Sequence, residues 1–179
     1  MPTRPDTEIE RRFLVHKVPA DLTLGEGRLV ADRYIPADAG HCYLRVRQDG
    51  DELQITKKVL KRDGDHSQML EYTIPLSKAE YEALCTVPSK DVIKRRYDHK
   101  IAQGTLQIGV FAQALSGLII ADVEFDSHEA SELFVTPHWV AAEVTGDKRF
   151  AGGELCGKSI GDLAAALAEY GITVAHRGA

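Results

Sequence analysis

The stretch Glu8–Val15, which reads Glu-Ile-Glu-Arg-Arg-Phe-Leu-Val, alternates charged with apolar residues. Successive side chains of a β-strand point to opposite faces, so residues two apart share a face. As a strand, this stretch places Glu8, Glu10 and Arg12 on one face, with Ile9, Phe13 and Val15 on the opposite face. The pattern predicts a strand with one almost purely charged face.

The same period of two residues recurs along the 179-residue chain, between short segments rich in Asp and Gly. We predict nine strands, at Glu8–Val15, Arg28–Ile35, His41–Gln48, Glu52–Val59, Ser67–Ile74, Val92–Lys100, Thr105–Phe111, Leu118–Asp126 and Val140–Val144. Three helices are predicted, at Ser77–Cys85, Ser127–Phe134 and Ser159–Tyr170. Short strands with tight turns favour an antiparallel meander or barrel over βαβ units. The length suits one domain over residues 1–179, with the strands within about 7–150 and a C-terminal helix at about 159–170.

Composition excludes several classes of function. The net charge of −5 argues against general attraction to nucleic acid or anionic lipid. The chain has no apolar run near the roughly 18 residues that a membrane helix needs. Its three cysteines, Cys42, Cys85 and Cys156, form neither a CxxC pair nor an even set. We therefore expect a cytoplasmic protein with reduced thiols, and neither a nucleic acid nor a membrane as partner.

Charged residues two apart also occur on later strands. Arg45 and Arg47 share a face, and so do Lys94 with Arg96 and Asp122 with Glu124; Lys57, Glu71 and Glu143 extend the set. The ordinary explanation is a half-buried sheet with its charges in water. Solvated strand faces, however, usually mix Thr, Ser, Gln and Lys. Paired arginines are better suited to bidentate capture of phosphate oxygens, which favours an anion-binding face.

These residues, in this order, resemble the CYTH family of the triphosphate tunnel superfamily, which includes bacterial inorganic triphosphatases. The first strand is similar to the family's Glu-x-Glu-x-Lys signature, with Arg12 in the lysine place. The similarity continues through Tyr43–Arg47, Ile55–Lys57, Glu71–Pro75, Lys94–Tyr97, Gly117–Phe125 and Glu143–Phe150. It spans about residues 7–150, and the ordered set is far more specific than a single Glu-x-Glu.

The resemblance implies a mainly β (α+β) fold, a closed eight-stranded antiparallel barrel with a few peripheral helices and charged inner walls. It implies a hydrolase of triphosphate compounds, with inorganic triphosphate as the first substrate and Mg²⁺ or Mn²⁺ as cofactor. The residues expected to bind phosphate are Arg12, Arg45, Arg47, Lys57, Lys94 and Arg96. Those expected to hold metal are Glu8, Glu10, Asp122 and Glu124. Catalytic roles are expected for Glu143, Glu71 and Lys57. If charges face inward, a homodimer would be one way of covering the outward apolar faces.

The sequence departs from the family pattern at a few places. Met69, Thr73 and Ser67 lie where the family often has a second acid and an arginine near Glu71, and Gly109 replaces a usual aspartate. These departures weaken the expectation of a full catalytic rate and of a second metal ion. They also keep a catalytically weak polyphosphate-binding module open as an alternative, beside a class IV-like adenylyl cyclase.

One further motif points to a different fold. Residues Gly152–Ser159 match the P-loop pattern G-x-x-x-x-G-K-[ST]. A P-loop follows a buried strand within several βα units, whereas almost everything before this motif has antiparallel character. We therefore interpret the segment as a glycine-rich loop before the last helix.

Overall fold

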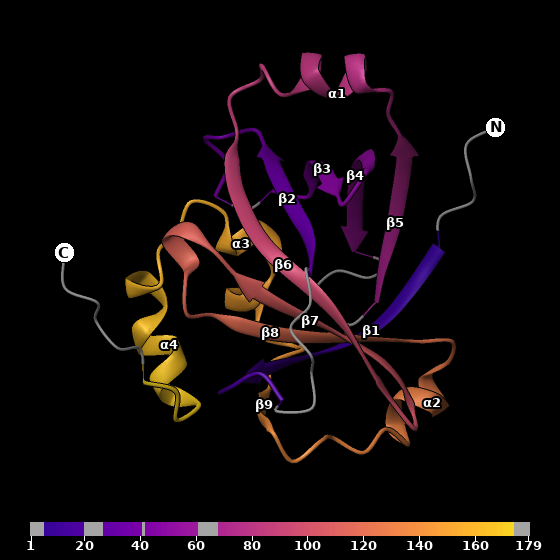
Figure 1. Ribbon diagram of the computed structural model, residues 1–179, viewed down its shortest axis with the longest axis vertical. Helices are drawn as coiled ribbons and strands as arrows, with labels where there is room; N and C mark the ends of the chain where they lie inside the picture. Colours follow the sequence, from indigo (N-terminus) through magenta and orange to yellow (C-terminus); the bar gives the residue numbers. More distant parts are fainter. Residues whose placement is uncertain (1–5, 20–26, 41, 61–67, 174–179) are drawn as a thin grey trace.

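The computed structural model describes residues 6–19, 27–40, 42–60 and 68–173 of the chain (Figure 1). Nine strands run in the order β1 (Asp6–Val15), β2 (Arg28–Ile35), β3 (Leu44–Asp49), β4 (Glu52–Leu60), β5 (Gln68–Pro75), β6 (Lys90–Ile101), β7 (Gly104–Phe111), β8 (Ile119–Phe125) and β9 (Val140–Glu143). The helices are α1 (Lys78–Leu84), α2 (His128–Glu132), α3 (Gly152–Leu155) and α4 (Ala164–Glu169). Three 3-10 turns complete the set, η1 (Gln113–Leu115), η2 (Lys148–Phe150) and η3 (Gly161–Leu163).

Local sequence explains most of these boundaries. All nine predicted strands are present, with ends that differ by up to three residues, and the predicted strand starts His41 and Ser67 lie outside the described residues. Helix α1 begins with the predicted capping box. The Ser77 hydroxyl accepts from the Glu80 amide at 3.3 Å, and the Glu80 carboxylate accepts from the Ser77 amide at 2.8 Å. Both groups satisfy amides that the first helical turn leaves without partners.

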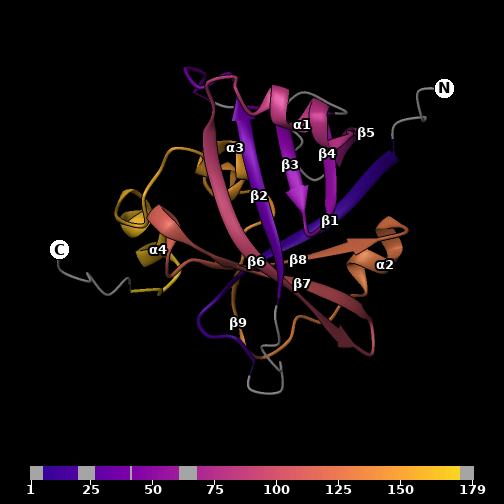
Figure 2. The same ribbon diagram turned by 45° about the horizontal axis from the view of Figure 1, so that its top comes forward.

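The strands form one antiparallel sheet in the order β5-β4-β3-β2-β6-β7-β8-β1-β9, with an additional pairing between β5 and β1. Strand β1 is shared: residues Ile9–Leu14 pair with β8, while on its other side Asp6–Ile9 pair with β5 and Phe13–Val15 with β9. The expected number of eight strands is therefore wrong, because the sheet has nine. Contact between β1 and β5 is limited to four residue pairs, so the sheet is not the regular closed eight-stranded barrel. Figure 2 shows how strongly it curves.

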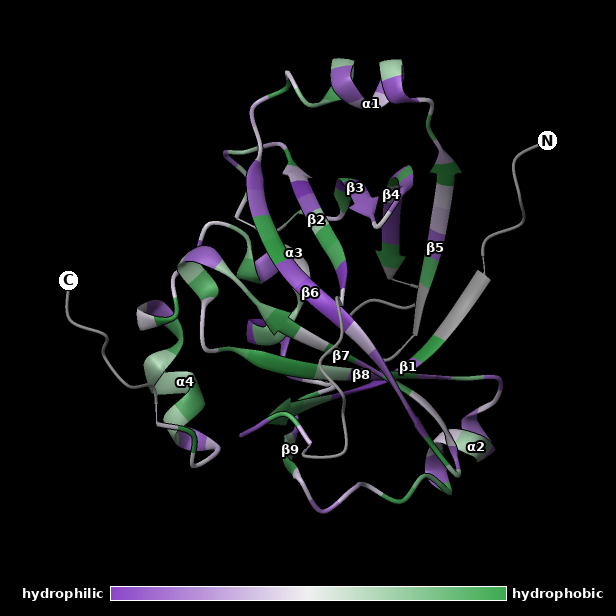
Figure 3. Cartoon of the chain, viewed as in Figure 1, coloured by the Kyte–Doolittle hydropathy of each residue, from purple (hydrophilic) through white to green (hydrophobic). Residues whose placement is uncertain are grey.

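The two faces of the sheet bury two different cores. On the outer face, Phe13, Ile108 and Val123 belong to a cluster that includes Phe134, just after α2. The inner face is charged at one end of the strands and apolar at the other. Its apolar end packs against the C-terminal segment in a cluster that includes Leu14, Tyr34, Val92, Phe111, Ile120, Phe150, Leu155, Leu163 and Leu167. Figure 3 shows hydrophilic and hydrophobic residues following one another along the strands, and hydrophobic residues within α4. The C-terminal segment therefore covers one end of the space inside the sheet.

The P-loop-like segment is part of this C-terminal covering. The residues before it form the 3-10 turn η2 instead of a strand, and Gly152–Leu155 form α3. Gly152 lies so close to Tyr34 that a Cβ atom there would fall 2.1 Å from the Tyr34 hydroxyl. Ser159 caps the next turn by accepting a hydrogen bond from the Asp162 amide at 3.3 Å. The segment therefore follows no buried strand, and the prediction of a glycine-rich loop before the last helix is correct only in part, because its first half is helical.

None of the described helices is long and apolar enough to cross a membrane.

Candidate active site: a charged pocket inside the sheet

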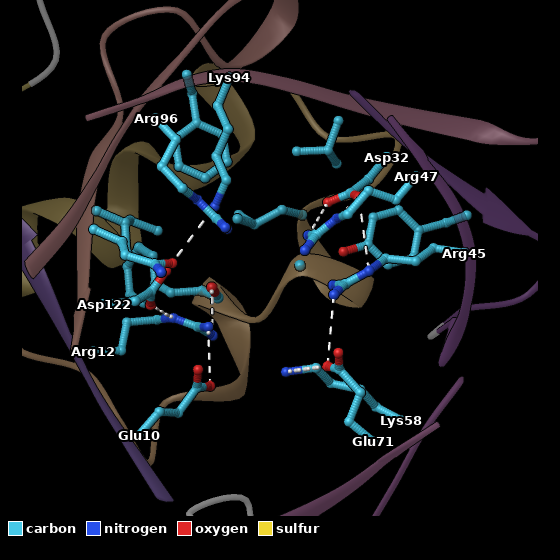
Figure 4. A pocket seen from close by; sticks show the side chains of 18 of the residues that line it. Glu10, Arg12, Asp32, Arg45, Arg47, Lys58, Glu71, Lys94, Arg96 and Asp122 are labelled. Atoms are coloured by element: carbon cyan, nitrogen blue, oxygen red, sulfur yellow. Dashed lines mark hydrogen bonds and ion pairs between the residues drawn. The ribbon is translucent and has the colours of Figure 1, made fainter. Parts of the chain in front are cut away.

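Inward-facing side chains of eight strands, β1 to β8, line one pocket, which has a volume of about 120 Å³ (Figure 4). Its floor is formed by apolar residues of the inner core, among them Val92, Phe111 and Leu155. Its walls carry six cationic and five acidic side chains. The cations are Arg12, Arg45, Arg47, Lys58, Lys94 and Arg96, and the acids are Glu10, Asp32, Glu71, Asp122 and Glu124. The structure thus brings together charges from residue 10 to residue 124 of the chain.

Arg12 is held between two acids on the β1–β8 wall. Its Nε atom donates to Asp122 Oδ1 at 2.7 Å, and its Nη2 atom donates to Glu10 Oε1 at 3.1 Å. Burial alone would raise the pKa of Asp122, but Arg12 and Lys94 lower this pKa to about 2. Asp122 is therefore ionised at neutral pH, and it fixes the direction in which Arg12 points.

Asp32 plays the same part on the opposite wall. Arg47 reaches it with two hydrogen bonds, Nε to Oδ1 at 2.6 Å and Nη2 to Oδ2 at 2.8 Å, and Arg45 Nε lies 3.7 Å from Oδ1. Burial would raise the pKa of Asp32, but the charges of Arg45 and Arg47 lower this pKa below its ordinary value. One buried carboxylate therefore orients two arginines while leaving the pair a net positive charge.

Glu71 on β5 is the third acid that organises cations. Its carboxylate lies 3.2 Å from Lys58 Nζ and 3.8 Å from Arg45 Nη2, and it accepts a hydrogen bond from Thr73 at 3.0 Å. Burial opposes ionisation, yet Lys58 and Arg45 lower the pKa of Glu71 overall. At neutral pH Glu71 is therefore a carboxylate on the wall of the pocket.

Lys94 and Arg96 enter the pocket from β6 (Figure 4). Burial, reinforced by the charge of Arg96, lowers the pKa of Lys94 to about 7. Arg96 Nη1 reaches Asp49 Oδ2 at 3.4 Å. The Nε atoms of Arg96 and Arg45 are buried and make no hydrogen bond with any residue that the structure describes. Buried donors of this kind are costly unless a ligand accepts from them, so the pocket is prepared for an anion.

The pocket also offers ligands for a divalent cation. Glu10 and Glu124 are direct partners across β1 and β8. Burial and the neighbouring charge of Glu10 raise the pKa of Glu124, although Lys58 and Arg96 act in the opposite direction. The described residues contain no cluster of three metal-binding side chains. Mg²⁺ usually takes one or two carboxylates plus waters and substrate phosphates, so the pair fits that chemistry.

The structure separates some of the predicted site residues from this pocket. Lys57 is exposed on the outer face of β4, with its Nζ 6.0 Å from the centroid of the Tyr43 ring, and the adjacent Lys58 takes its predicted place. Glu143 also lies outside, opposite Phe13, where Arg11 binds it with Nη2 to Oε2 at 2.5 Å. The Glu8 side chain lies outside the described part of the chain.

Two pocket residues were missed in the sequence. The inward position of Lys58 could have been predicted from the sequence. Lys58 shares a strand face with Gln54 and Thr56, whereas Lys57 shares its face with Ile55 and Val59. Asp32 gave a weaker indication. It is a single acid between Val30 and Tyr34 on one face of β2, and its role appears only when β3 lies beside it.

Comparison with known proteins agrees with this arrangement. A family model described as the CYTH domain matches residues 6–145. An inorganic triphosphatase of Nitrosomonas europaea is 38% identical over 148 residues, which are 80% of this chain and 93% of that protein. An inorganic triphosphatase of Acetivibrio thermocellus is 33% identical over 83% of this chain and 92% of its own. The solved structure of the inorganic triphosphatase NE1496 has a TM-score of 0.59 at 33% identity, and the match covers 83% of this chain and 97% of that chain.

Proposed function

The chain belongs to the CYTH domain family, and from this membership we propose that it hydrolyses inorganic triphosphate with the help of Mg²⁺ or Mn²⁺. The observation that carries the proposal is the set of six cations and five acids around one pocket. A triphosphate places several negative charges along a short chain, and few other metabolites need that many cations. The acids reduce the repulsion among the cationic side chains, and some of them can also bind a metal ion.

In the proposed reaction the cations bind the phosphate oxygens and stabilise charge on the transferred group. Arg45 and Arg47 approach from β3, Lys94 and Arg96 from β6, and Lys58 from β4. A water oxygen attacks the terminal phosphorus atom, the bridging P–O bond breaks, and phosphate and pyrophosphate result. Cations held by Asp32, Asp122 and Glu71 need not rearrange during this step, which is the basis of electrostatic stabilisation of a transition state.

Different acids of the pocket would bind the metal ion and orient the attacking water. Glu10 and Glu124 would hold the divalent ion, which adds positive charge beside the phosphate oxygens. Asp122 is engaged by Arg12 and Lys94, so its proposed part is mainly to orient those cations. Glu71 is ionised and can accept a hydrogen bond from the attacking water and so orient it.

The test uses purified protein with inorganic triphosphate, ATP or thiamine triphosphate, each with Mg²⁺, Mn²⁺ or EDTA. We expect phosphate release from inorganic triphosphate with either metal and none in EDTA. Pyrophosphate with cyclic AMP from ATP would assign the protein as a cyclase. Thermal stabilisation by triphosphate without turnover would assign it as a binding module. Either outcome would contradict the hydrolase.

A matched pair of variants locates the activity in the pocket. Arg45→Ala removes an inward arginine but leaves Asp32 paired with Arg47, so the protein should remain folded. We expect most turnover to be lost. Arg33→Ala is the control, because Arg33 lies on the next strand and binds Ser89 outside the pocket. Equal turnover in the two variants would remove the assignment of the site.

A further inference from the structure

Gly109 of β7 pairs directly with Arg96 of β6 and Ile120 of β8, and it lies on the diagonal between Lys94 of β6 and Asp122 of β8. On the inner face of β7 lie Phe111, Gly109 and Gln107, in that order. Lys94 of β6 is the direct partner of Phe111, and Asp122 of β8 is the direct partner of Gln107. Residues two apart in a strand are separated by about 7 Å. Lys94 must therefore pass over Gly109 to approach Asp122.

The Lys94 side chain takes this path. Its Nζ atom lies 4.0 Å from Asp122 Oδ2 and 5.3 Å from the centroid of the Phe111 ring. A Cβ atom built on Gly109 would lie 2.9 Å from Lys94 Cδ and 3.4 Å from Lys94 Nζ. Real Cβ atoms essentially never come as close to another atom as the first of these distances. A side chain at position 109 would therefore require the flexible Lys94 side chain to shift from its path.

Backbone conformation does not explain this glycine. The φ angle of Gly109 lies outside the left-handed region, so another residue could adopt the same backbone. Glycine inside a strand weakens it and often marks a place where another group approaches closely. Here the approaching group is the Lys94 side chain.

We propose that Gly109 is a positioning residue, whose missing side chain opens the path by which Lys94 crosses β7 and presents its ammonium group to Asp122 and the bound phosphates. The inference rests on the proposed function only in taking a triphosphate as the ligand. In this arrangement Lys94 Nζ lies 4.0 Å from Asp122 Oδ2, with Arg96 as its cationic neighbour.

The test is a double-mutant cycle on binding, which separates an effect through Lys94 from a direct one. The variants are Gly109→Ala, Lys94→Ala and the double variant, and the ligand is inorganic triphosphate in EDTA, measured by calorimetry. We expect each single variant to weaken binding about tenfold, as for loss of one charge-assisted hydrogen bond. The double variant should bind no more weakly than Lys94→Ala alone. With metal present, the same variants should raise KM more than they lower kcat.

Controls separate positioning from damage to the fold. Gly146→Ala is the matched glycine substitution, since no atom lies within 4 Å of a Cβ built there, and it should bind like the wild type. Thermal unfolding of Gly109→Ala should be unchanged or at a higher temperature. If Lys94→Ala does not fold, Lys94→Met keeps the apolar stem and takes its place in the cycle.

Two results would overturn the inference. Gly109→Ala could bind triphosphate as well as the wild type, or it could weaken binding equally in the presence and absence of Lys94. Failure of the proposed function gives a different result. Wild-type protein would then bind triphosphate in EDTA but release no phosphate with Mg²⁺ or Mn²⁺, and the cycle would still be measurable.

Discussion

Glu10 on β1 and Glu124 on β8 are direct cross-strand partners, and both side chains line the pocket. Like charges placed directly opposite each other destabilise a sheet. The next inward pair of the two strands, Arg12 with Asp122, is a hydrogen-bonded ion pair at 2.7 Å. The wall therefore pairs opposite charges at one level and places two acids opposite each other at the next, where Arg12 also donates to Glu10.

The Glu10–Glu124 pair predicts a response to divalent metal. Glu124→Gln removes the repulsion, so without metal it should raise the midpoint of thermal unfolding by about 2 °C. In the wild type, Mg²⁺ or Mn²⁺ should raise that midpoint, and in the variant this gain should largely disappear. Melting curves with and without EDTA measure both effects. Glu82→Gln, on the exposed surface of α1, is the control. An equal metal response in all three proteins would place the metal elsewhere.

The adjacent lysines of β4 should have opposite importance. Lys58→Ala removes a pocket cation that pairs with Glu71, and we expect kcat/KM for triphosphate to fall by about ten- to a hundredfold. Lys57→Ala removes an exposed cation on the outer face and should change kcat/KM by less than about twofold. Steady-state kinetics at saturating metal compare the two. A larger loss in Lys57→Ala would restore the assignment made from sequence.

Asp32 should control stability in a pH-dependent way. Asp32→Asn leaves Arg45 and Arg47 without their buried counter-charge, at a cost of about 3 kcal/mol in the free energy of unfolding at neutral pH. The pKa of Asp32 is lowered by folding, so its contribution is complete above the ordinary value of 3.8 and is lost as pH falls below it. The difference between wild type and variant should therefore shrink in acid.

Urea denaturation over a series of pH values measures this difference. Asp91→Asn is the control, because Asp91 lies on the neighbouring strand with its side chain 46% exposed and paired with Arg33. Its substitution should cost less than about 1 kcal/mol. A difference for Asp32→Asn that stayed constant into acid would contradict the ion-pair explanation.

Arg11 and Glu143 should matter for the fold more than for turnover. Arg11 donates to Glu143 and to the Ser131 carbonyl at 3.0 Å, and its guanidinium lies 5.5 Å from the centroid of the Phe134 ring. Arg11→Ala should lower the free energy of unfolding by about 2 kcal/mol. Glu143→Gln should lower it by less than about 1 kcal/mol. Denaturation curves and the kcat of folded protein distinguish this from catalysis. Lost turnover at unchanged stability in Glu143→Gln would support a catalytic role.

Most strands could be located from sequence because alternation is a local property. The predicted Arg28–Ile35 strand is the one observed, and Thr105–Phe111 gains only Gly104. The count of eight strands came from the resemblance and not from the pattern, which itself contains nine. The short η2 and α3 segments were not predicted, because a few residues carry no useful periodicity.

The prediction of pocket residues also depended on how clearly each strand alternates. Glu10, Arg12, Arg45, Arg47, Lys94, Arg96, Asp122 and Glu124 lie on strands with clear alternation, and the structure brings them together. Lys57 and Glu143 lie outside the pocket for different reasons. The alternation of β4 groups Lys57 with the apolar Ile55 and Val59, so its outer position could be predicted, whereas β9 reads Val-Ala-Ala-Glu, in which apolar residues occupy both faces. A shift of one residue in such a segment moves every side chain to the other face.

The residue pattern was enough to locate the strands and to show that several carry one charged face, because strand geometry converts a period of two directly into faces. That Asp32 orients two arginines, and that Lys94 crosses Gly109 toward Asp122, is visible only in the folded chain. Those relationships depend on the register between strands that are distant in the chain, and the pattern within any one strand carries no information about that register.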